Sequence, residues 1–284
     1  MKSCKRFTSL LLTTLALLLL PHAELYSQVQ EPELLSTREV RTPMEEGYRN
    51  GLGFNAIVNN FGFGIGMEYK RVVSSFSEVT ATVRWTGLRD VSEQVFTDFF
   101  GQQLIPNKYK RAFAFPAFFG FRQRVFGEAI DDNFRFYLEA ASGPVAAFTY
   151  PYFRDDNNNG FRETFTIYNE PVYDVLTGIG DGSWKLGLGG ELKLSLDVGD
   201  NFSRLTSIQF GYTFYYFHQG VQVMIPNQPI RKQQPAQGEF QFELTPEECT
   251  EYISGTCDLR MQPFYPSQSF FGSPQISFIF GRMW

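Results

Sequence analysis

The chain has 284 residues, of which 43% are hydrophobic and 17% aromatic, and its formal net charge is −5. An acidic balance disfavours nucleic acid as a partner, because binding to a phosphate backbone depends on clustered Lys and Arg. Mean hydropathy is −0.21 despite 31 Phe and 14 Tyr, which indicates that polar residues separate the apolar ones. The length suits one large all-β domain or two small domains.

Residues 1–27 have the pattern of a secretory signal peptide. Three basic residues precede an apolar run over residues 10–20, and Pro21 and the small side chains of Ala23 and Ser27 follow it. The run is shorter than the roughly 20 residues of a transmembrane helix. We therefore expect export and cleavage after Ala23 or Ser27, with an uncleaved anchor as the alternative.

Residues 28–46 contain prolines and charges and show neither helical nor strand periodicity, so we expect a flexible periplasmic leader. The remaining domain covers residues 47–284. No segment of it is apolar over enough residues to form a membrane helix, so a membrane span within it would consist of strands.

From residue 48 onward, apolar residues alternate with polar or small ones at the period of a β-strand. In residues 61–70, every odd position from Phe61 to Tyr69 is apolar or aromatic, and every even position is Gly, Glu or Lys. The pattern predicts one apolar face and one polar face for each strand. The predicted strands cover residues 48–59, 61–73, 77–87, 108–126, 133–150, 184–198, 202–216 and 274–284.

Some positions depart from regular alternation. Pro116 lies inside the fourth predicted strand and removes a ladder hydrogen bond, which predicts a bulge or a locally open edge. Gly143 and Pro144 predict a break in phase in the fifth strand. Residues 161–175 and 239–244 are also rich in β-formers, and we expect hairpin extensions there, with ten strands as the alternative to eight.

The connections are sorted by length. Those after the second, fourth and sixth strands are short, with the sequences SSFS, GEAIDD and VGDN. The others are a tight turn near residue 59 and long loops over residues 88–107, 151–182 and 217–273. Short turns at one end and long loops at the other are typical of an outer-membrane β-barrel, with the loops outside the cell.

Residues 48–284 thus resemble the small OmpA-type outer-membrane β-barrels. The final strand is similar to the carboxy-terminal signal that the outer-membrane assembly machinery reads, with Phe278, Phe280 and Trp284 at alternate positions, although Arg282 interrupts the series. The signal-peptide end with Gln28 after Ser27 is similar to Bacteroidetes-type export. The resemblance implies a closed antiparallel up-and-down transmembrane β-barrel in outer-membrane lipid of a Gram-negative cell.

Ten charged residues fall on the predicted inner face. Eight strands leave an interior just wide enough for side chains, so we expect these charges to pair and plug the lumen. An ion-selective lumen, which would make the protein a small-solute channel, is the alternative. The ten residues are Glu68, Lys70, Arg84, Arg122, Arg124, Arg135, Glu139, Glu191, Lys193 and Asp197.

Two loops contain candidate sites of other kinds. Asp155, Asn157 and Asn159 match the start of a calcium-binding loop, and Glu163 could add an oxygen, but Thr166 stands where a bidentate Glu belongs, so a polar turn is the favoured interpretation. The two cysteines of the last loop, Cys249 and Cys257, are expected to form a disulfide in an oxidising compartment. No other cofactor is expected.

Small barrels that resemble lipid A palmitoyltransferase or lipid A deacylase use His and Ser for acyl transfer or hydrolysis. Only His218 remains after removal of the signal peptide, and Gly220 stands where a partner serine would be, so we expect no enzyme. We expect instead a role in envelope integrity, adhesion or partner binding through the external loops. Aromatic side chains suited to such contacts are Phe240, Phe242, Phe264, Tyr265, Phe270 and Phe271.

Overall fold

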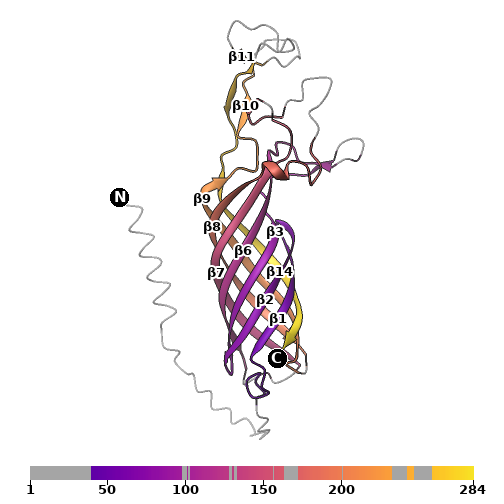
Figure 1. The fold of residues 1–284 in the computed structure, drawn as a ribbon, viewed down its shortest axis with the longest axis vertical. Coiled ribbons are helices and arrows are strands. Elements are labelled where there is room, and N and C mark those ends of the chain that lie inside the picture. The colour runs from indigo at the N-terminus through magenta and orange to yellow at the C-terminus, as the bar shows by residue number, and fades with distance from the viewer. Residues whose placement is uncertain are drawn as a thin grey trace, which may run out of the picture. The chain divides into compact units, whose positions relative to one another are not determined.

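The computed structural model describes residues 40–97, 101, 103–127, 130, 133–155, 157–162, 172–199, 201–231, 242–245 and 258–284. Eight long strands dominate this part of the chain (Figure 1). No helix within it has the length and apolar character needed to cross a membrane. The long strands are β1 (Asn50–Asn59), β2 (Gly62–Ser74), β3 (Ser77–Gly87), β6 (Lys110–Val125), β7 (Phe134–Pro151), β8 (Ser183–Val198), β9 (Arg204–Val221) and β14 (Gln268–Met283).

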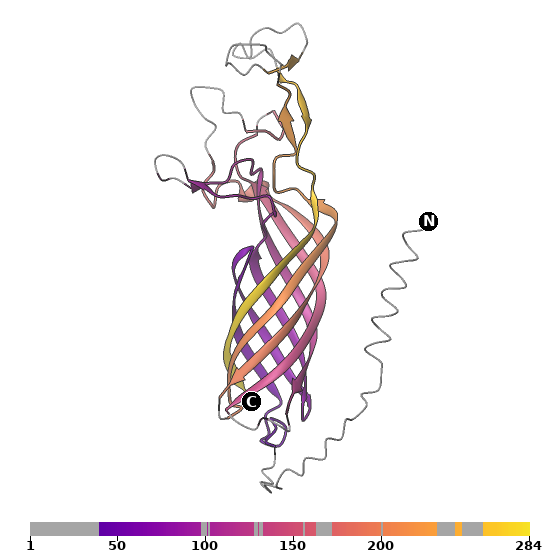
Figure 2. The same ribbon diagram turned by 180° about the vertical axis from the view of Figure 1, so that it is seen from behind.

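The eight strands form one antiparallel sheet that closes into a ring in the order β1-β14-β9-β8-β7-β6-β3-β2. The first strand closes the ring by pairing with the last, from Gly51 opposite Met283 to Asn59 opposite Gln275. The backbone N–H groups of Arg49 and Asn50 also bond to the carbonyl of Trp284. The prediction of an all-β fold with eight strands in the closed sheet is therefore confirmed. Strands cross the front and the back of the ring in the two opposite views (Figures 1 and 2).

Connection lengths follow the predicted sorting. The connections after β2, β6 and β8 are short, and we call this edge of the ring the turn end. The opposite edge, the loop end, has the two-residue turn after β1 and the long loops after β3, β7 and β9. The long loops contain a short 3-10 helix, η1 (Ile179–Asp181), which precedes β8. They also contain six short strands, namely β4 (Phe96–Thr97), β5 (Gln103–Leu104), β10 (Asn227–Pro229), β11 (Leu244–Thr245), β12 (Asp258–Leu259) and β13 (Met261–Pro263).

The predicted hairpin extensions are present in part. In the last loop, Phe242 bridges Arg231, and Leu244 pairs with Leu259. In the second long loop, Val172 bridges Phe153, whereas residues 163–171 lie outside the described part of the chain. Neither segment joins the eight-stranded sheet as far as it is described.

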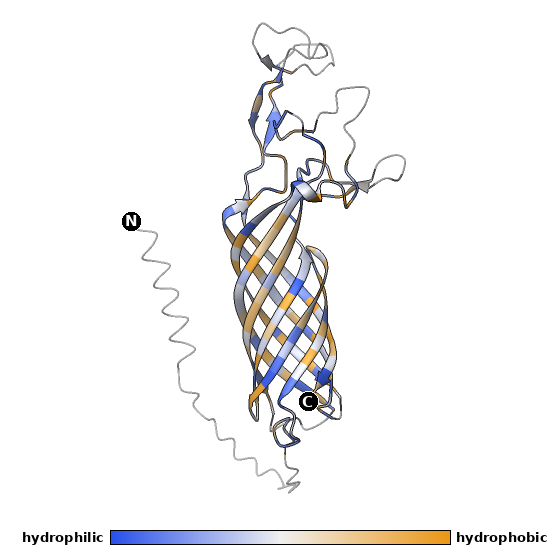
Figure 3. Cartoon of the chain, viewed as in Figure 1, coloured by the Kyte–Doolittle hydropathy of each residue, from blue (hydrophilic) through white to orange (hydrophobic). Residues whose placement is uncertain are grey.

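Hydrophobic and hydrophilic residues intermix along the long strands (Figure 3), and many of the exposed large side chains on them are apolar whereas most of the buried charged ones point inward. On β8, the outward side chains of Leu186 and Leu188 are 79% and 67% exposed, whereas the inward Glu191 and Lys193 are each 1% exposed. Alternation along a strand produces this difference because successive side chains point to opposite faces.

Phe61 is an exception to the predicted outward face. Asn59 pairs with Gly62, so Asn60 and Phe61 are turn residues rather than strand residues. The ring of Phe61 packs inside the closed sheet, 5.9 Å from the ring of Tyr215. The positive φ of Gly62, 121°, lets the chain reverse direction before the outward series begins at Phe63.

The prediction made for Pro116 and the one made for Gly143 and Pro144 differ in how they compare with the structure. Around Pro116 the pairing of β6 with β3 lapses between Ala114 and Ala117 without a change of register, so a local gap rather than a bulge accommodates the missing N–H. The break in phase predicted at Gly143 and Pro144 is wrong. Inward burial continues at odd positions through β7, because its register with β8 stays constant across both residues.

The last two strands are longer than predicted. β9 continues to Val221 and β14 begins at Gln268, so the last loop covers residues 222–267 rather than 217–273. Phe217 and Phe271 are fully buried and contact each other inside the ring, with ring centroids 5.9 Å apart. Packing inside the ring therefore supports strand pairing beyond the point where the sequence pattern fades.

Candidate functional site

All ten charged residues predicted for the inner face are buried. Eight of them, together with Glu78, form a continuous set of ion pairs in the middle of the ring, whereas Arg124 and Arg135 lie nearer the turn end. We call the nine connected residues the interior charge network. Its members are Glu68, Lys70, Glu78, Arg84, Arg122, Glu139, Glu191, Lys193 and Asp197.

Lys193 on β8 is one centre of this network. Its Nζ lies 2.8 Å from Glu191 Oε1, 2.9 Å from Glu139 Oε1 and 3.6 Å from Glu68 Oε2. Glu68 also lies 3.3 Å from Lys70 Nζ. The contact between β2 and β8 crosses the interior, so the network joins strands that are not neighbours in the sheet.

Arg84 on β3 forms an ion pair with Glu191, one of the carboxylates that contact Lys193. Its guanidinium donates two hydrogen bonds to Glu191, one of them from Nη2 to Oε1 at 2.7 Å. Such bidentate pairs are among the stronger ion pairs in proteins. Gly66 lies opposite Arg84 on β2, and a Cβ there would be 2.7 Å from Arg84 Cγ. Glycine at this inward position therefore leaves room for the arginine.

Arg122 on β6 is the other centre. It donates to both carboxylate oxygens of Asp197 and to Glu78 Oε2 at 2.9 Å, and its Nε lies 4.0 Å from Glu139 Oε2. Its guanidinium stacks on the ring of Tyr137 at 3.7 Å. Glu78 was not among the ten charged residues predicted for the inner face. The signal was present, since Glu78 shares the even positions of β3 with Arg84.

Near the turn end, two arginines bond to other groups. Arg124 donates to the backbone carbonyls of Arg41 at 3.1 Å and Ile130 at 3.0 Å. Arg135 stacks on the ring of Phe202 at 4.2 Å. Arg41 belongs to the predicted leader, and the next residue, Thr42, is buried. The described end of the leader, residues 40–46, therefore contacts the ring.

Toward the loop end, most of the buried side chains in the interior are apolar, and the half-buried Lys185 of β8 donates to the backbone carbonyl of Gly220. On β9, Tyr215 and Phe217 follow the polar inward positions Gln209 and Thr213, and both rings are buried. They belong to a cluster that we call the apolar layer. The apolar layer was not predicted from the sequence, although several of its members lie at inward positions of the alternation. The layer contains Leu88, Ala112, Ala114, Phe118, Ala141, Val145, Ala147, Tyr215, Phe217, Val221, Val223 and Phe271, with Phe61 packed against it.

The network and the apolar layer limit what the interior can do chemically. Each carboxylate of the network lies within ion-pair distance of a lysine or arginine, which compensates the desolvation of several kcal/mol per buried ion. The apolar layer then separates the charges from the loop end. The arrangement suits a packed interior rather than a water-filled path.

The candidate calcium loop has the hydrogen bonds of a polar turn. Asp155 accepts bonds from the backbone N–H groups of Asn159 at 3.1 Å and Gly160 at 3.0 Å, and Asn157 Oδ1 accepts one from Asn159. Within the described residues, no group of three or more His, Cys, Asp or Glu is placed to hold a metal ion. Glu163 and the predicted disulfide of Cys249 and Cys257 lie outside the described residues.

Asp155 also connects the loop after β7 to the loop after β3 through a hydrogen bond. Tyr109 donates a hydrogen bond to Asp155 Oδ2 at 3.1 Å, and burial together with this carboxylate raises the pKa of Tyr109 to about 12. Tyr109 packs with Phe161 and Tyr265 against buried Phe153 and Ile225. The loops after β3, β7 and β9 therefore share an apolar cluster, which we call the loop platform.

The aromatic residues proposed as loop anchors have different positions. Tyr265 packs in the loop platform, and Phe264 lies against it with ring centroids 4.2 Å apart. Phe270 and Phe271 are strand residues, and Phe271 is buried in the apolar layer, so it is unsuited to partner contact. Phe242 is half-buried. Phe240 lies outside the described residues.

Phe278 and Phe280 of the predicted assembly signal lie on the outside of β14, Trp284 follows its last residue, and His218 lies on β9. Phe278, Phe280 and Trp284 are 38%, 56% and 56% exposed. His218 is exposed near the loop end of β9, two residues before Gly220, as the sequence indicates.

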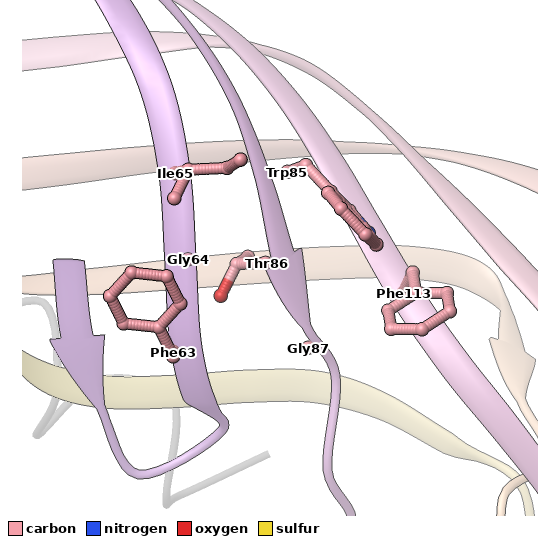
Figure 4. Close-up of a pocket in the computed structure, with 7 residues that line it drawn as sticks. All are labelled: Phe63, Gly64, Ile65, Trp85, Thr86, Gly87 and Phe113. Carbon is pink, nitrogen blue, oxygen red and sulfur yellow. The ribbon is translucent and has the colours of Figure 1, made fainter. Parts of the chain in front are cut away.

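A shallow pocket of about 120 Å³ lies on the outer wall where β2, β3 and β6 approach the loop end. Phe63, Trp85 and Phe113 form its aromatic walls, and Gly64 and Gly87 leave it open (Figure 4). Trp85 and Phe113 meet edge to face with ring centroids 5.4 Å apart. The pocket is part of the apolar outer face.

Comparison of the chain with protein-family models, with curated proteins and with solved structures gave no match. The resemblance to OmpA-type barrels therefore stays a prediction that rests on the sequence pattern.

Proposed function

We propose that the mature chain is an integral outer-membrane protein of a Gram-negative cell, with the ring of strands as a transmembrane β-barrel. This proposal rests on where polar and apolar side chains lie, since apolar side chains cover the outside of the ring and ion pairs fill the inside. In water, exposed leucines such as Leu186 and Leu188 would be unfavourable, because large apolar patches associate. In hydrocarbon the same face is favourable, and the closed ring leaves no unpaired edge.

Aromatic contacts on the outer face support this proposal. Near the loop end, the rings of Phe148 and Trp184 lie 4.8 Å apart, and Phe115 packs on Trp184 at 5.4 Å. Trp85 and Phe113 continue the series across β3 and β6. Aromatic belts of this kind mark the boundary between hydrocarbon and water in membrane proteins.

The proposed barrel is closed and non-catalytic. The interior charge network and the apolar layer both fill the lumen, which favours a structural or binding role over a small-solute channel. The loops that the loop platform holds together are the part of the chain best suited to contact a partner outside the cell, because loops fixed by packing lose less entropy on binding. We therefore propose a role in envelope integrity or in binding through these loops, with no lipid A chemistry.

Two measurements test this proposal. After outer-membrane fractionation, the protein is expected in the membrane fraction, with faster gel migration before heating than after. In planar bilayers it is expected to give no stable ion conductance. Recovery of the processed chain from periplasm or medium without detergent would refute the membrane proposal, and a stable open conductance would refute the plugged interior.

A further inference from the structure

Three arginines lie on the outer face of the ring at its turn end. Arg71 is on β2, Arg204 on β9 and Arg282 on β14, and all three side chains are exposed. Arg282 and Arg204 are direct cross-strand partners. On β1, Leu52 pairs with Arg282 and Asn50 pairs with Arg71, so β1 alone separates Arg71 from the other two.

This arrangement places like charges together without compensation. Like charges directly opposite each other on antiparallel strands destabilise the sheet. Among the described residues, no carboxylate forms an ion pair with Arg71, Arg204 or Arg282. Arg282 also interrupts the outward apolar series of Phe278, Phe280 and Trp284. The cluster is therefore unfavourable unless an anion from outside the chain accompanies it.

The neighbouring side chains indicate where this anion lies. Tyr69 and Trp284 are outward aromatic neighbours of the three arginines, and Tyr69 donates a hydrogen bond to Asn50 Oδ1 at 2.7 Å. Rings with an apolar body and a polar edge prefer the level of lipid headgroups. In a membrane, the arginines would therefore lie at the headgroup level of the leaflet that meets the turn end.

We infer that Arg71, Arg204 and Arg282 bind the headgroup of an anionic phospholipid in that leaflet. The inference rests on the proposed function, since only a membrane-spanning ring presents this face to lipid. Guanidinium groups match phosphate oxygens in planar, two-point hydrogen bonds, and a negative headgroup removes the repulsion between Arg204 and Arg282. The bound lipid would bridge β2, β1, β14 and β9, the strands at which the ring closes.

The first test measures lipid binding to the full mature protein in detergent, by native mass spectrometry with added phosphatidylglycerol or phosphatidylcholine. The double variant Arg204→Gln, Arg282→Gln is expected to lose affinity for phosphatidylglycerol by roughly fivefold per arginine removed. Phosphatidylcholine binding is expected to stay unchanged. The matched control Arg154→Gln, Arg260→Gln removes the same charge from exposed loop positions and is expected to keep the wild-type affinity.

A second measurement compares the melting temperatures of the double variant and the wild type, in zwitterionic detergent and in phosphatidylglycerol vesicles. In zwitterionic detergent, the double variant is expected to melt at a higher temperature than the wild type, because the repulsion is gone. In phosphatidylglycerol vesicles it is expected to melt at a lower temperature, because the bound lipid is lost. A wild-type protein that enters vesicles with heat-modifiable migration, yet binds both lipids equally, would overturn this inference alone. Failure of the wild type to enter vesicles would instead overturn the proposed function, and the lipid site with it.

Discussion

Replacing Lys193 with Met tests whether the interior charge network stabilises the ring. Met has nearly the length of Lys but carries no charge, so the substitution leaves three carboxylates without their shared cation. These carboxylates are not equally affected. Glu191 keeps its bidentate pair with Arg84, and Glu68 keeps Lys70 at 3.3 Å.

Glu139 loses most. Its remaining partners are Arg122 at 4.0 Å and the hydroxyl of Thr80 at 3.1 Å. Removing one partner of a buried ion pair costs about 3 to 5 kcal/mol, largely because the other charge stays desolvated. We therefore expect Lys193→Met to lower the free energy of unfolding by about this amount, mainly through Glu139.

The assay is urea unfolding of the protein in lipid vesicles, followed by tryptophan fluorescence. In the Lys193→Met background, Glu139→Gln is expected to restore about half or more of the loss, because a neutral amide no longer needs the cation. Glu191→Gln in the same background is the matched control and is expected to destabilise further, because it also breaks the pair with Arg84. Equal rescue by both substitutions, or a loss below about 1 kcal/mol for Lys193→Met, would refute this account.

Three further predictions concern the outer face, the inner face and the loops. Leu192→Arg on the outer face is expected to cost about 2 to 4 kcal/mol in vesicles if that face meets hydrocarbon, whereas Val91→Arg, in a loop, is expected to change unfolding little. Gly66→Ala is expected to destabilise by about 1 to 3 kcal/mol in urea unfolding, because its Cβ would meet the backbone carbonyl of Val83 and the Cγ of Arg84, while a Cβ at Gly180 would have no atom within 4 Å, so Gly180→Ala serves as the control. The pKa of Tyr109 is raised to about 12, above the usual value of about 10, so its contribution to stability is present below pH 10 and is lost as the pH rises through 12. Tyr109→Phe is expected to flatten the fall in melting temperature over this interval, and an unchanged profile would contradict the role of its hydroxyl.

The alternation of apolar and polar residues was sufficient to predict the eight strands and the face of nearly every side chain on them. Period-two alternation is a local property, since neighbouring side chains of a strand point to opposite faces whatever the strand pairs with. Glu191 and Lys193 could therefore be placed inside from the sequence alone. Phe61 could not, because a two-residue turn interrupts the alternation just before Gly62.

The tertiary structure alone decided which charges meet. Lys193 reaches Glu68 across the ring, and Arg84 reaches Glu191 on a strand that is not its neighbour, because closure brings opposite walls within the length of two side chains. Closure also makes a packed apolar layer of Phe118, Phe217 and Phe271. Which face a side chain takes depends on the strand itself, whereas its partner depends on the order, register and closure of the whole sheet, so only the first can be predicted from the sequence.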